Sequence, residues 1–190
     1  MNSFIISDYN YDPFFKHYFT EAEDWLKQYE KPLLDYVIEK LPKYVENILI
    51  FGCASGRDFI PFSKNYKCFG FDLAKPSEIS WVCSTENLDY YQCSIEDFMD
   101  KNVISKFDLS KSLVYTQGVL MYISSENQTK FSMELIKHGC RNIVFHEYPP
   151  EYTGPHTRFN PSEKVLNIFE RRHFRSEVDN QPTGFLYLNK

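Results

Sequence analysis

Short runs of apolar residues alternate with helix-like patterns along most of the chain. The runs predict buried strands at 47–51, 67–71, 90–93, 113–116 and 142–145. Helical segments are expected between them, at 57–64, after residue 94, and at 126–138. Because strands alternate with helices in this way, the pattern is typical of an α/β protein with a mostly parallel sheet.

The residues ahead of the first predicted strand form a different kind of segment. Residues 1–12 are polar and irregular, and Asp12-Pro13 is a helix-start signal for a helix that runs to about residue 29. Apolar residues on one face then predict a second helix between Pro32 and Pro42. We take the chain as one domain, with residues 1–44 as a helical cover or lid and residues 45–190 as the core.

The chain closes with a helix and two β-like segments. The helix is expected from about residue 161 to residue 170, and the β-like segments are His173–Val178 and Gly184–Leu188. The residues between the two segments, Asp-Asn-Gln-Pro-Thr, are strong turn formers. We therefore expect an antiparallel hairpin at the end of the chain.

Composition narrows the class of protein. A net charge of −5 disfavours a nucleic-acid partner, and no apolar run approaches the roughly 20 residues that cross a bilayer. The amino terminus lacks a secretory pattern. The five cysteines form no Cys-x-x-Cys pair, which favours a reduced protein over a disulfide framework or a zinc site. We expect a cytoplasmic protein without a metal, membrane or nucleic-acid partner.

A turn of small residues follows the first predicted strand in NILIFGCASGRDFI, residues 47–60. Gly52 and Gly56 permit backbone angles and close approaches that a side chain would forbid. Asp72 ends the second strand, 20 residues after Gly52, where an acid can accept two hydrogen bonds from a ribose diol. The alternative is an aspartate that only caps the next turn. Turn, strand and spacing together predict a nucleoside-containing cofactor.

The spacing of the glycines separates two classes of cofactor. Dinucleotide sites favour G-x-G-x-x-G, whereas this turn is G-x-x-x-G with Ala54 in its centre. The turn resembles motif I of class I S-adenosylmethionine-dependent methyltransferases. KCFGFDL, QCSIEDF and SLVYTQGVLMYI are similar to the motifs of that family's next three strands. The resemblance implies a Rossmann-like, seven-stranded sheet, mostly parallel, with an antiparallel C-terminal hairpin and helices on both faces.

The resemblance also implies S-adenosyl-L-methionine as the cofactor and assigns residues to its parts. By that resemblance, the residues near the methionine part are Gly52, Ala54 and Gly56, with Thr116 or Gln117 at its amino end. Asp72 would hold the ribose. Leu73 would flank the adenine, and Ser94 and Ile95 would lie at the adenine edge. Asp58 is a further candidate for the amino-acid end, or simply a first-turn acid favoured by the helix dipole.

Two positions depart from the family pattern. Ala54 replaces the middle glycine, which we expect to be tolerated if its φ stays negative. Ser94 stands where the family often has aspartate, so Ser94, Glu96, Asp97 or backbone atoms alone are left to bind the adenine amino group.

Candidates for the acceptor side lie beyond the ends of the fourth and fifth strands. His146 and Tyr115 are the candidate catalytic residues, because histidine has the unperturbed pKa that best suits a general base at neutral pH. A histidine at a strand end is also commonly structural. Substrate contacts are expected from Tyr11, Tyr18, Tyr122, His156 and Arg158, although the pattern around the last two slightly favours solvated loop residues.

These patterns predict a methyltransferase that acts on a small polar molecule. We expect an oxygen acceptor (hydroxyl, phosphate-type or carboxylate) in a metabolite or a surface-glycan precursor. The alternatives are an N-methyltransferase of a small amine and a non-catalytic binding protein with the methyltransferase fold. A nicotinamide-dependent oxidoreductase is disfavoured by the glycine spacing.

Overall fold

The computed structural model describes residues 1–6, 31–146, 170–175 and 182–188, with side chains for 1–6 and 34–146. The helix expected at 13–29 lies outside the described residues. So does the helix expected at 161–170, apart from residue 170, which begins a strand.

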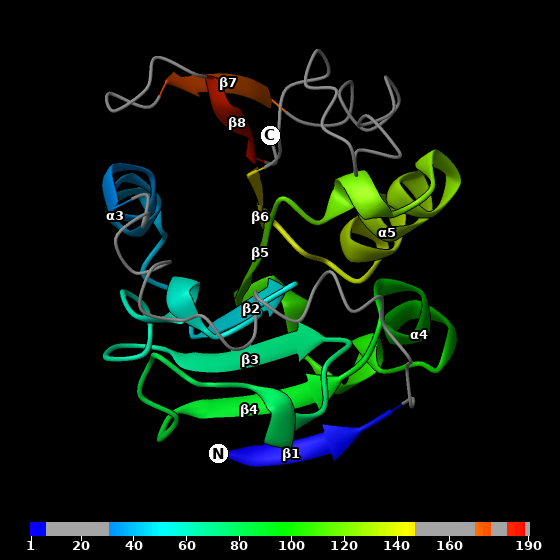
Figure 1. The fold of residues 1–190 in the computed structure, drawn as a ribbon. Helices are drawn as coiled ribbons and strands as arrows, with labels where there is room; N and C mark the ends of the chain where they lie inside the picture. The colour runs from blue at the N-terminus through cyan, green and yellow to red at the C-terminus, as the bar shows by residue number, and fades with distance from the viewer. Residues whose placement is uncertain (7–30, 147–169, 176–181, 189–190) are drawn as a thin grey trace.

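A parallel sheet of six strands forms the centre of the described structure, in the order β1-β4-β3-β2-β5-β6 (Figure 1). The strands are β1 (Asn2–Ile5), β2 (Asn47–Phe51), β3 (Lys67–Asp72), β4 (Leu88–Gln92), β5 (Ser112–Gln117) and β6 (Asn142–His146). Every neighbouring pair is parallel. The five strands expected from the apolar runs are therefore confirmed.

The edge strand β1 contradicts the expectation of an irregular amino terminus. It pairs with β4 from Asn2 opposite Asp89 to Ile5 opposite Gln92, and Phe4 stacks on Tyr91 with ring centroids 4.7 Å apart. All four of its residues are exposed. Because it buries neither face, β1 has no periodic apolar signal, and its strand conformation depends on pairing with β4.

Two further strands lie beside the central sheet. β7 (Glu170–Arg175) and β8 (Pro182–Leu188) pair antiparallel in a sheet of their own, and β8 lies next to β6. The central sheet therefore has six strands among the described residues, rather than the seven that were expected.

Helices cover both faces of the central sheet (Figure 1). The α3 face carries α3 (Lys31–Lys40) and the irregular segment that follows β3. The α4–α5 face carries α4 (Ile95–Asp100) and α5 (Ser125–Lys137). Short 3₁₀ turns are η2 (Arg57–Phe59), η3 (Pro76–Glu78), η4 (Ile104–Lys106), η5 (Leu109–Lys111) and η6 (Leu120–Tyr122). No described helix is long and apolar enough to cross a bilayer.

The helix expected at 57–64 is wrong beyond its first turn. Only η2 forms there, starting after Gly56 at φ 85°, and turns follow it. Pro61 lacks the N–H of a helical residue and its ring clashes with the preceding turn, so the segment does not continue as an α-helix.

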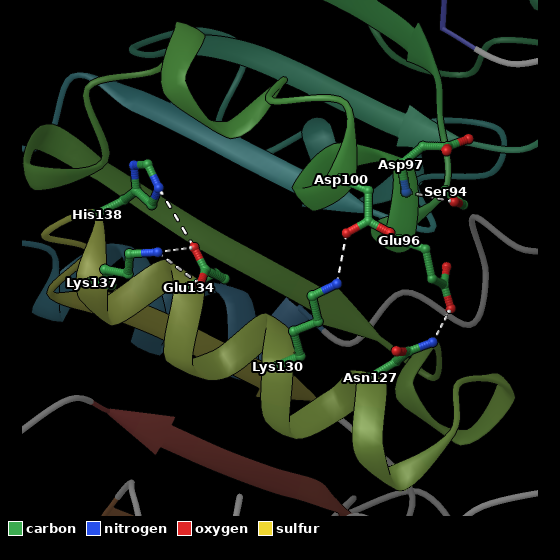
Figure 2. Close-up of polar contacts among 9 residues, drawn as sticks. All are labelled: Ser94, Glu96, Asp97, Asp100, Asn127, Lys130, Glu134, Lys137 and His138. Atoms are coloured by element: carbon green, nitrogen blue, oxygen red, sulfur yellow. Dashed lines mark hydrogen bonds and ion pairs between the residues drawn. The ribbon is translucent and has the colours of Figure 1, made fainter.

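Aromatic rings fill the α4–α5 face. Phe51 stacks on Phe71 at 4.5 Å between centroids, and the edges of Phe98 and Phe131 meet it at 4.9 and 5.0 Å. Polar contacts then join the two helices at their exposed sides (Figure 2). Asn127 donates to Glu96 at 3.0 Å, and Lys130 pairs with Asp100 at 2.6 Å; both contacts run between α4 and α5.

Candidate functional site

The order of the strands reverses between β2 and β5. From β2 the chain adds β3 and β4 on one side, and then β5 and β6 on the other. In open α/β sheets, ligands bind beyond the carboxyl ends of the strands at this switch point. The turn after β2, the end of β3 and the end of β5 therefore frame the candidate site.

The two glycines of the turn allow close packing by other parts of the protein. Both have left-handed φ, 67° at Gly52 and 85° at Gly56. A Cβ on Gly52 would lie 2.1 Å from Val119 Cγ2, and one on Gly56 would lie 2.8 Å from Cys83 Sγ and 3.0 Å from Trp81 Cε3. Protein atoms thus already fill the space beside both glycines on the side where a Cβ would project.

Ala54, at the centre of the turn, also has a left-handed backbone. Its φ is 44°, so the condition under which alanine was expected to be tolerated, a negative φ, is not met. An L-residue pays about 1–2 kcal/mol for this conformation. The Ala54 N–H donates to Asp72 Oδ2 at 2.7 Å, and this bond holds the strained residue in place.

Asp72, at the end of β3, is a half-buried carboxylate bound by backbone donors. Its Oδ1 accepts from the Leu73 N–H at 2.7 Å, while Oδ2 accepts from Ala54. Each carboxylate oxygen can accept a second hydrogen bond. Burial raises the pKa of Asp72 to about 6, although backbone N–H groups of Ala54, Leu73 and Ala74 oppose that rise. A raised carboxyl pKa at the end of a strand is typical of a functional site.

A second group of polar side chains lies beside Asp72, at the end of β4. Gln92 is fully buried; its Nε2 donates to the Leu73 carbonyl at 3.2 Å, and its Oε1 has no partner among the described atoms. The Tyr90 hydroxyl donates to the Ala74 carbonyl at 2.6 Å. Trp81 meets Tyr90 edge-on at 5.3 Å, and its Nε1 also has no described partner. Two buried polar atoms are therefore available for a ligand or for water.

The residues expected at the adenine edge have structural roles. The Ser94 hydroxyl accepts from the Asp97 N–H at 3.0 Å and caps α4 (Figure 2). Ile95 is buried in the α4–α5 face. Glu96 accepts from Asn127, and Asp97 pairs with Lys101 at 3.4 Å.

A chain of polar contacts connects the turn to the end of β5. Arg57 Nε donates to Asp58 Oδ1 at 3.2 Å, and Arg57 Nη2 donates to Gln117 Oε1 at 2.9 Å. Burial raises the pKa of Asp58, and the guanidinium of Arg57 opposes that rise. Thr116 is fully buried, whereas Gln117 is half-buried and bound to Arg57.

The chain of contacts continues from Gln117 to the end of β6. The Tyr115 hydroxyl lies 3.5 Å from Gln117 Oε1 and 3.3 Å from His146 Nδ1. Tyr115 is fully buried, and His146 is 6% exposed. The two candidate catalytic residues are thus in contact with each other and, through Gln117, with the turn after β2.

The structure describes one of the five candidate substrate residues. Tyr122 lies half-buried in η6. Tyr11, Tyr18, His156 and Arg158 lie outside the described residues. Among the residues that are described, no group of histidine, cysteine or acidic side chains is arranged to hold a metal ion.

Sequence reasoning missed two residues of the site, Arg57 and Gln92. Both had a visible signal: Arg57 follows Gly56 directly, and Gln92 is a polar residue inside a predicted buried strand. Their partners are distant in sequence, however. Arg57 binds Gln117 across 60 positions, a contact that local patterns do not contain.

Comparisons with known proteins give the fold a context. No family model and no curated protein matches the sequence. Among solved structures, 1,6-didemethyltoxoflavin-N1-methyltransferase from Burkholderia thailandensis, with bound 1,6-didemethyltoxoflavin and S-adenosylhomocysteine, matches with a TM-score of 0.63 at 15% identity, over 93% of this chain and 85% of that one.

Two further solved structures agree. The N-methyltransferase NodS from Bradyrhizobium japonicum WM9 matches with a TM-score of 0.58 at 13% identity, over 88% of this chain and 99% of that one. WbdD, in a structure with the kinase inhibitor LY294002, matches at 0.57 and 13% identity over 84% of this chain. The matched region is 40% of the length of WbdD. The chain therefore has the class I methyltransferase fold.

Proposed function

We propose that the protein is an S-adenosylmethionine-dependent methyltransferase that acts on a small polar acceptor. The observation that carries the proposal is the Asp72 carboxylate. It lies at the switch point of this fold, is oriented by two backbone N–H groups, and has lone pairs left for a ribose diol. The toxoflavin methyltransferase, which shares the fold, holds S-adenosylhomocysteine and a small-molecule substrate, which supports the proposal.

The described side chains fit the parts of this cofactor. In the proposal Asp72 binds the ribose and Leu73 flanks the adenine. Gln92 Oε1, a buried acceptor without a described partner, suits the adenine amino group better than Ser94, whose hydroxyl caps α4. Arg57, held between Asp58 and Gln117, supplies a cation for the methionine carboxylate.

The acceptor side of the proposal depends on His146. When bound, the cofactor supplies an activated methyl group, so the protein has to align the acceptor and remove its proton where it has one. His146 ends β6, and its Nδ1 lies 3.3 Å from the hydroxyl of Tyr115 in β5; in the proposal His146 is the proton acceptor. An imidazole can take the proton of a hydroxyl, and we therefore propose an oxygen acceptor, with the N-methylation of a small amine as the alternative.

The proposal also includes the domain organisation and the cellular compartment of the protein. We propose a single methyltransferase domain in which the segment between β1 and β2 covers or closes the site, because β1 itself is part of the sheet. All five cysteines are free thiols. Free thiols support a reducing, cytoplasmic compartment.

Calorimetric titration with S-adenosylmethionine and S-adenosylhomocysteine tests the proposal. We expect the wild-type protein to bind both ligands and Asp72→Asn to lose about tenfold to a hundredfold in affinity, because hydrogen bonds to a charged group contribute about 1.5–3 kcal/mol. Asp89→Asn is the matched control, since Asp89 is an acid on the adjacent strand that contacts Asn2 and Lys67. Absence of binding to both ligands would refute the proposal.

A non-catalytic binding protein is the second candidate, and one observation favours it. Val119, Trp81 and Cys83 already pack against the two glycines of the turn. If the protein does not use a cofactor, a crystal soaked with S-adenosylhomocysteine should keep these contacts and hold no ligand near Asp72. A ligand in contact with Asp72 would exclude this candidate.

A further inference from the structure

The turn after β2 contains a strained alanine at a position that usually belongs to glycine. The Gly56 N–H donates to the Cys53 carbonyl at 2.8 Å, which closes a four-residue β-turn with Ala54 and Ser55 at its centre. Ala54 has φ 44°, whereas Ser55 is not among the described non-glycine residues with positive φ. Positive φ at the first central residue alone is the pattern of a type II′ turn, where glycine is usual. Alanine therefore needs support here that glycine would not need.

The carboxylate of Asp72 gives this support from the end of β3. Its Oδ2 accepts from the Ala54 N–H and its Oδ1 accepts from the Leu73 N–H, both at 2.7 Å. Hydrogen bonds to a charged acceptor are roughly twice as strong as neutral ones. Because the two donors bind different oxygens, both oxygens have to be acceptors. The ionised carboxylate meets this requirement, whereas the side chain of asparagine has a single acceptor oxygen.

The same turn leads directly into the cation of the candidate site. Arg57 follows Gly56 in the chain, and its guanidinium contacts Asp58 at 3.2 Å and Gln117 at 2.9 Å. The place of the Arg57 backbone depends on the conformation of the turn that precedes it. Asp72 is thus connected to Arg57 through three intervening residues of the turn, although no printed contact joins the two side chains.

We propose that Asp72 is also a positioning residue for the amino-acid end of the cofactor, because its bond to the Ala54 N–H holds the turn in the conformation that places Arg57. The inference rests on the proposed function, in which Asp72 binds the ribose and Arg57 binds the methionine carboxylate. One carboxylate then couples the two ends of the cofactor site. Loss of Asp72 weakens binding at both ends, although its side chain contacts the cofactor only at the ribose.

Two ligands that share a nucleoside separate these roles. 5′-Methylthioadenosine has the ribose diol of S-adenosylhomocysteine but lacks its amino and carboxylate groups. Asp72→Ala, which removes both acceptor oxygens, would weaken the two ligands by the same factor if Asp72 acted only at the ribose. We expect S-adenosylhomocysteine to lose about threefold to tenfold more in titration calorimetry, which corresponds to one hydrogen bond. Asp89→Asn is the matched control and should change neither affinity. Equal losses for the two ligands would overturn the coupling.

The Ala54→Gly substitution tests whether the coupling passes through the turn. Glycine adopts positive φ readily, so the turn then depends less on the bond to Asp72. In the Ala54→Gly background, Asp72→Ala should cause a smaller excess loss for S-adenosylhomocysteine, and a double-mutant cycle measures the difference. A contact with the ribose alone, or a general loss of stability, would not respond in this way. An excess loss that Ala54→Gly leaves unchanged would overturn the route through Ala54.

Hydrogen exchange of the Ala54 amide, measured by NMR, reports the bond without any ligand. The amide should be protected in the wild-type protein and in Asp89→Asn, and should exchange about tenfold to a hundredfold faster in Asp72→Ala. An unchanged rate in a folded Asp72→Ala protein would overturn the proposal. An unprotected Ala54 amide in the wild-type protein would overturn it as well, even if the variant does not fold.

These measurements and the test of the proposed function fail separately. If the protein binds neither ligand, the proposed function is wrong, and exchange of the Ala54 amide still decides whether Asp72 holds the turn. Conversely, equal losses for the two ligands would overturn the coupling and leave cofactor binding by Asp72 intact.

Discussion

The two faces of the central sheet differ in the segments that cover them and in the side chains that they bury. On the α4–α5 face, two capped helices cover a cluster of stacked and edge-on aromatic rings. On the α3 face, a helix and irregular turns cover a core that includes Tyr90, Tyr115 and three cysteines. Asp58, Gln92 and His146 are buried on this second face or at its edge.

The difference follows from how the segments over each face satisfy the hydrogen bonds of their backbone groups. A helix pairs most of its own N–H and C=O groups, so side chains beneath it are free to be apolar. Irregular segments leave backbone groups for side chains to bind, as when Tyr90 and Gln92 donate to the carbonyls of Ala74 and Leu73. On the α4–α5 face, Gln128 binds the carbonyls of Leu120 and Ile123 in the same way, but the polar side chains of the α3 face also lie beside the candidate site.

The largest expected effect is a loss of stability from a substitution on the α4–α5 face. Phe98 is fully buried, and its ring meets those of Phe51 and Phe71 at 4.9 and 5.1 Å. Phe98→Ala should lower the free energy of unfolding by about 3–5 kcal/mol, measured by urea denaturation. Met99→Ala, at a half-buried neighbour, is the control and should cost less. A loss below about 1 kcal/mol would contradict the close packing of this face.

Replacement of Gly52 tests the packing at the turn after β2, where Val119, which packs on the α4–α5 face, approaches the backbone. Gly52→Ala and Gly139→Ala both place a side chain at positive φ, but only the first meets an atom at 2.1 Å; the nearest at Gly139 is 3.9 Å away. We expect Gly52→Ala to lower the free energy of unfolding by about 1–3 kcal/mol more than Gly139→Ala does. Val119→Ala in the Gly52→Ala background should recover part of this excess. Equal losses at the two glycines would show that Val119 does not fill the space.

The ionisation of Asp72 should make cofactor binding on the α3 face depend on pH. With a pKa of about 6, Asp72 should be mostly ionised at pH 7 and mostly protonated at pH 5, so affinity for S-adenosylmethionine should fall about tenfold over this range. Titration calorimetry at the two pH values measures the change. An affinity that does not vary between them would contradict the role of the carboxylate.

The same pKa has the opposite effect on the unliganded protein. Because the folded-state pKa lies above the ordinary value of 3.8, the folded protein binds the proton more tightly than the unfolded chain. The contribution of Asp72 to stability is therefore greatest below about pH 4 and is lost as the pH rises through 6. The stability difference between wild type and Asp72→Asn, measured by denaturation across this range, should become less favourable to the wild type as the pH rises.

The smallest expected effect is a gain in stability at Ala54. Ala54→Gly removes the cost of a left-handed L-residue but makes the unfolded chain more flexible, for a net gain of at most about 1 kcal/mol. Ala74→Gly is the control, because Ala74 is fully buried without a positive φ and should lose stability. Differential scanning calorimetry compares the two. If Ala54→Gly destabilises as much as Ala74→Gly, the strain at Ala54 is not real.

Local patterns predicted the regular part of the fold because its signals are local. Each inner strand is a short apolar run, as at Asn47–Phe51, and α5 has both a Ser124 cap and apolar periodicity. The edge strand β1 has neither signal, because it is exposed and owes its conformation to β4. The segment after Gly56 was overestimated as a helix because Pro61 outweighs the apolar periodicity around it.

The sequence alone determined the order of strands β2 to β6 and of helices α3, α4 and α5, the small-residue turn, and the position of Asp72 at the end of β3. These depend on residues that are close together in the chain. The tertiary structure decided the left-handed φ of Ala54, the packing of Val119 on Gly52, and the line of contacts from Arg57 through Gln117 and Tyr115 to His146. Each depends on segments brought together only when the parallel strands pair, because a parallel sheet aligns the ends of strands that are far apart in sequence.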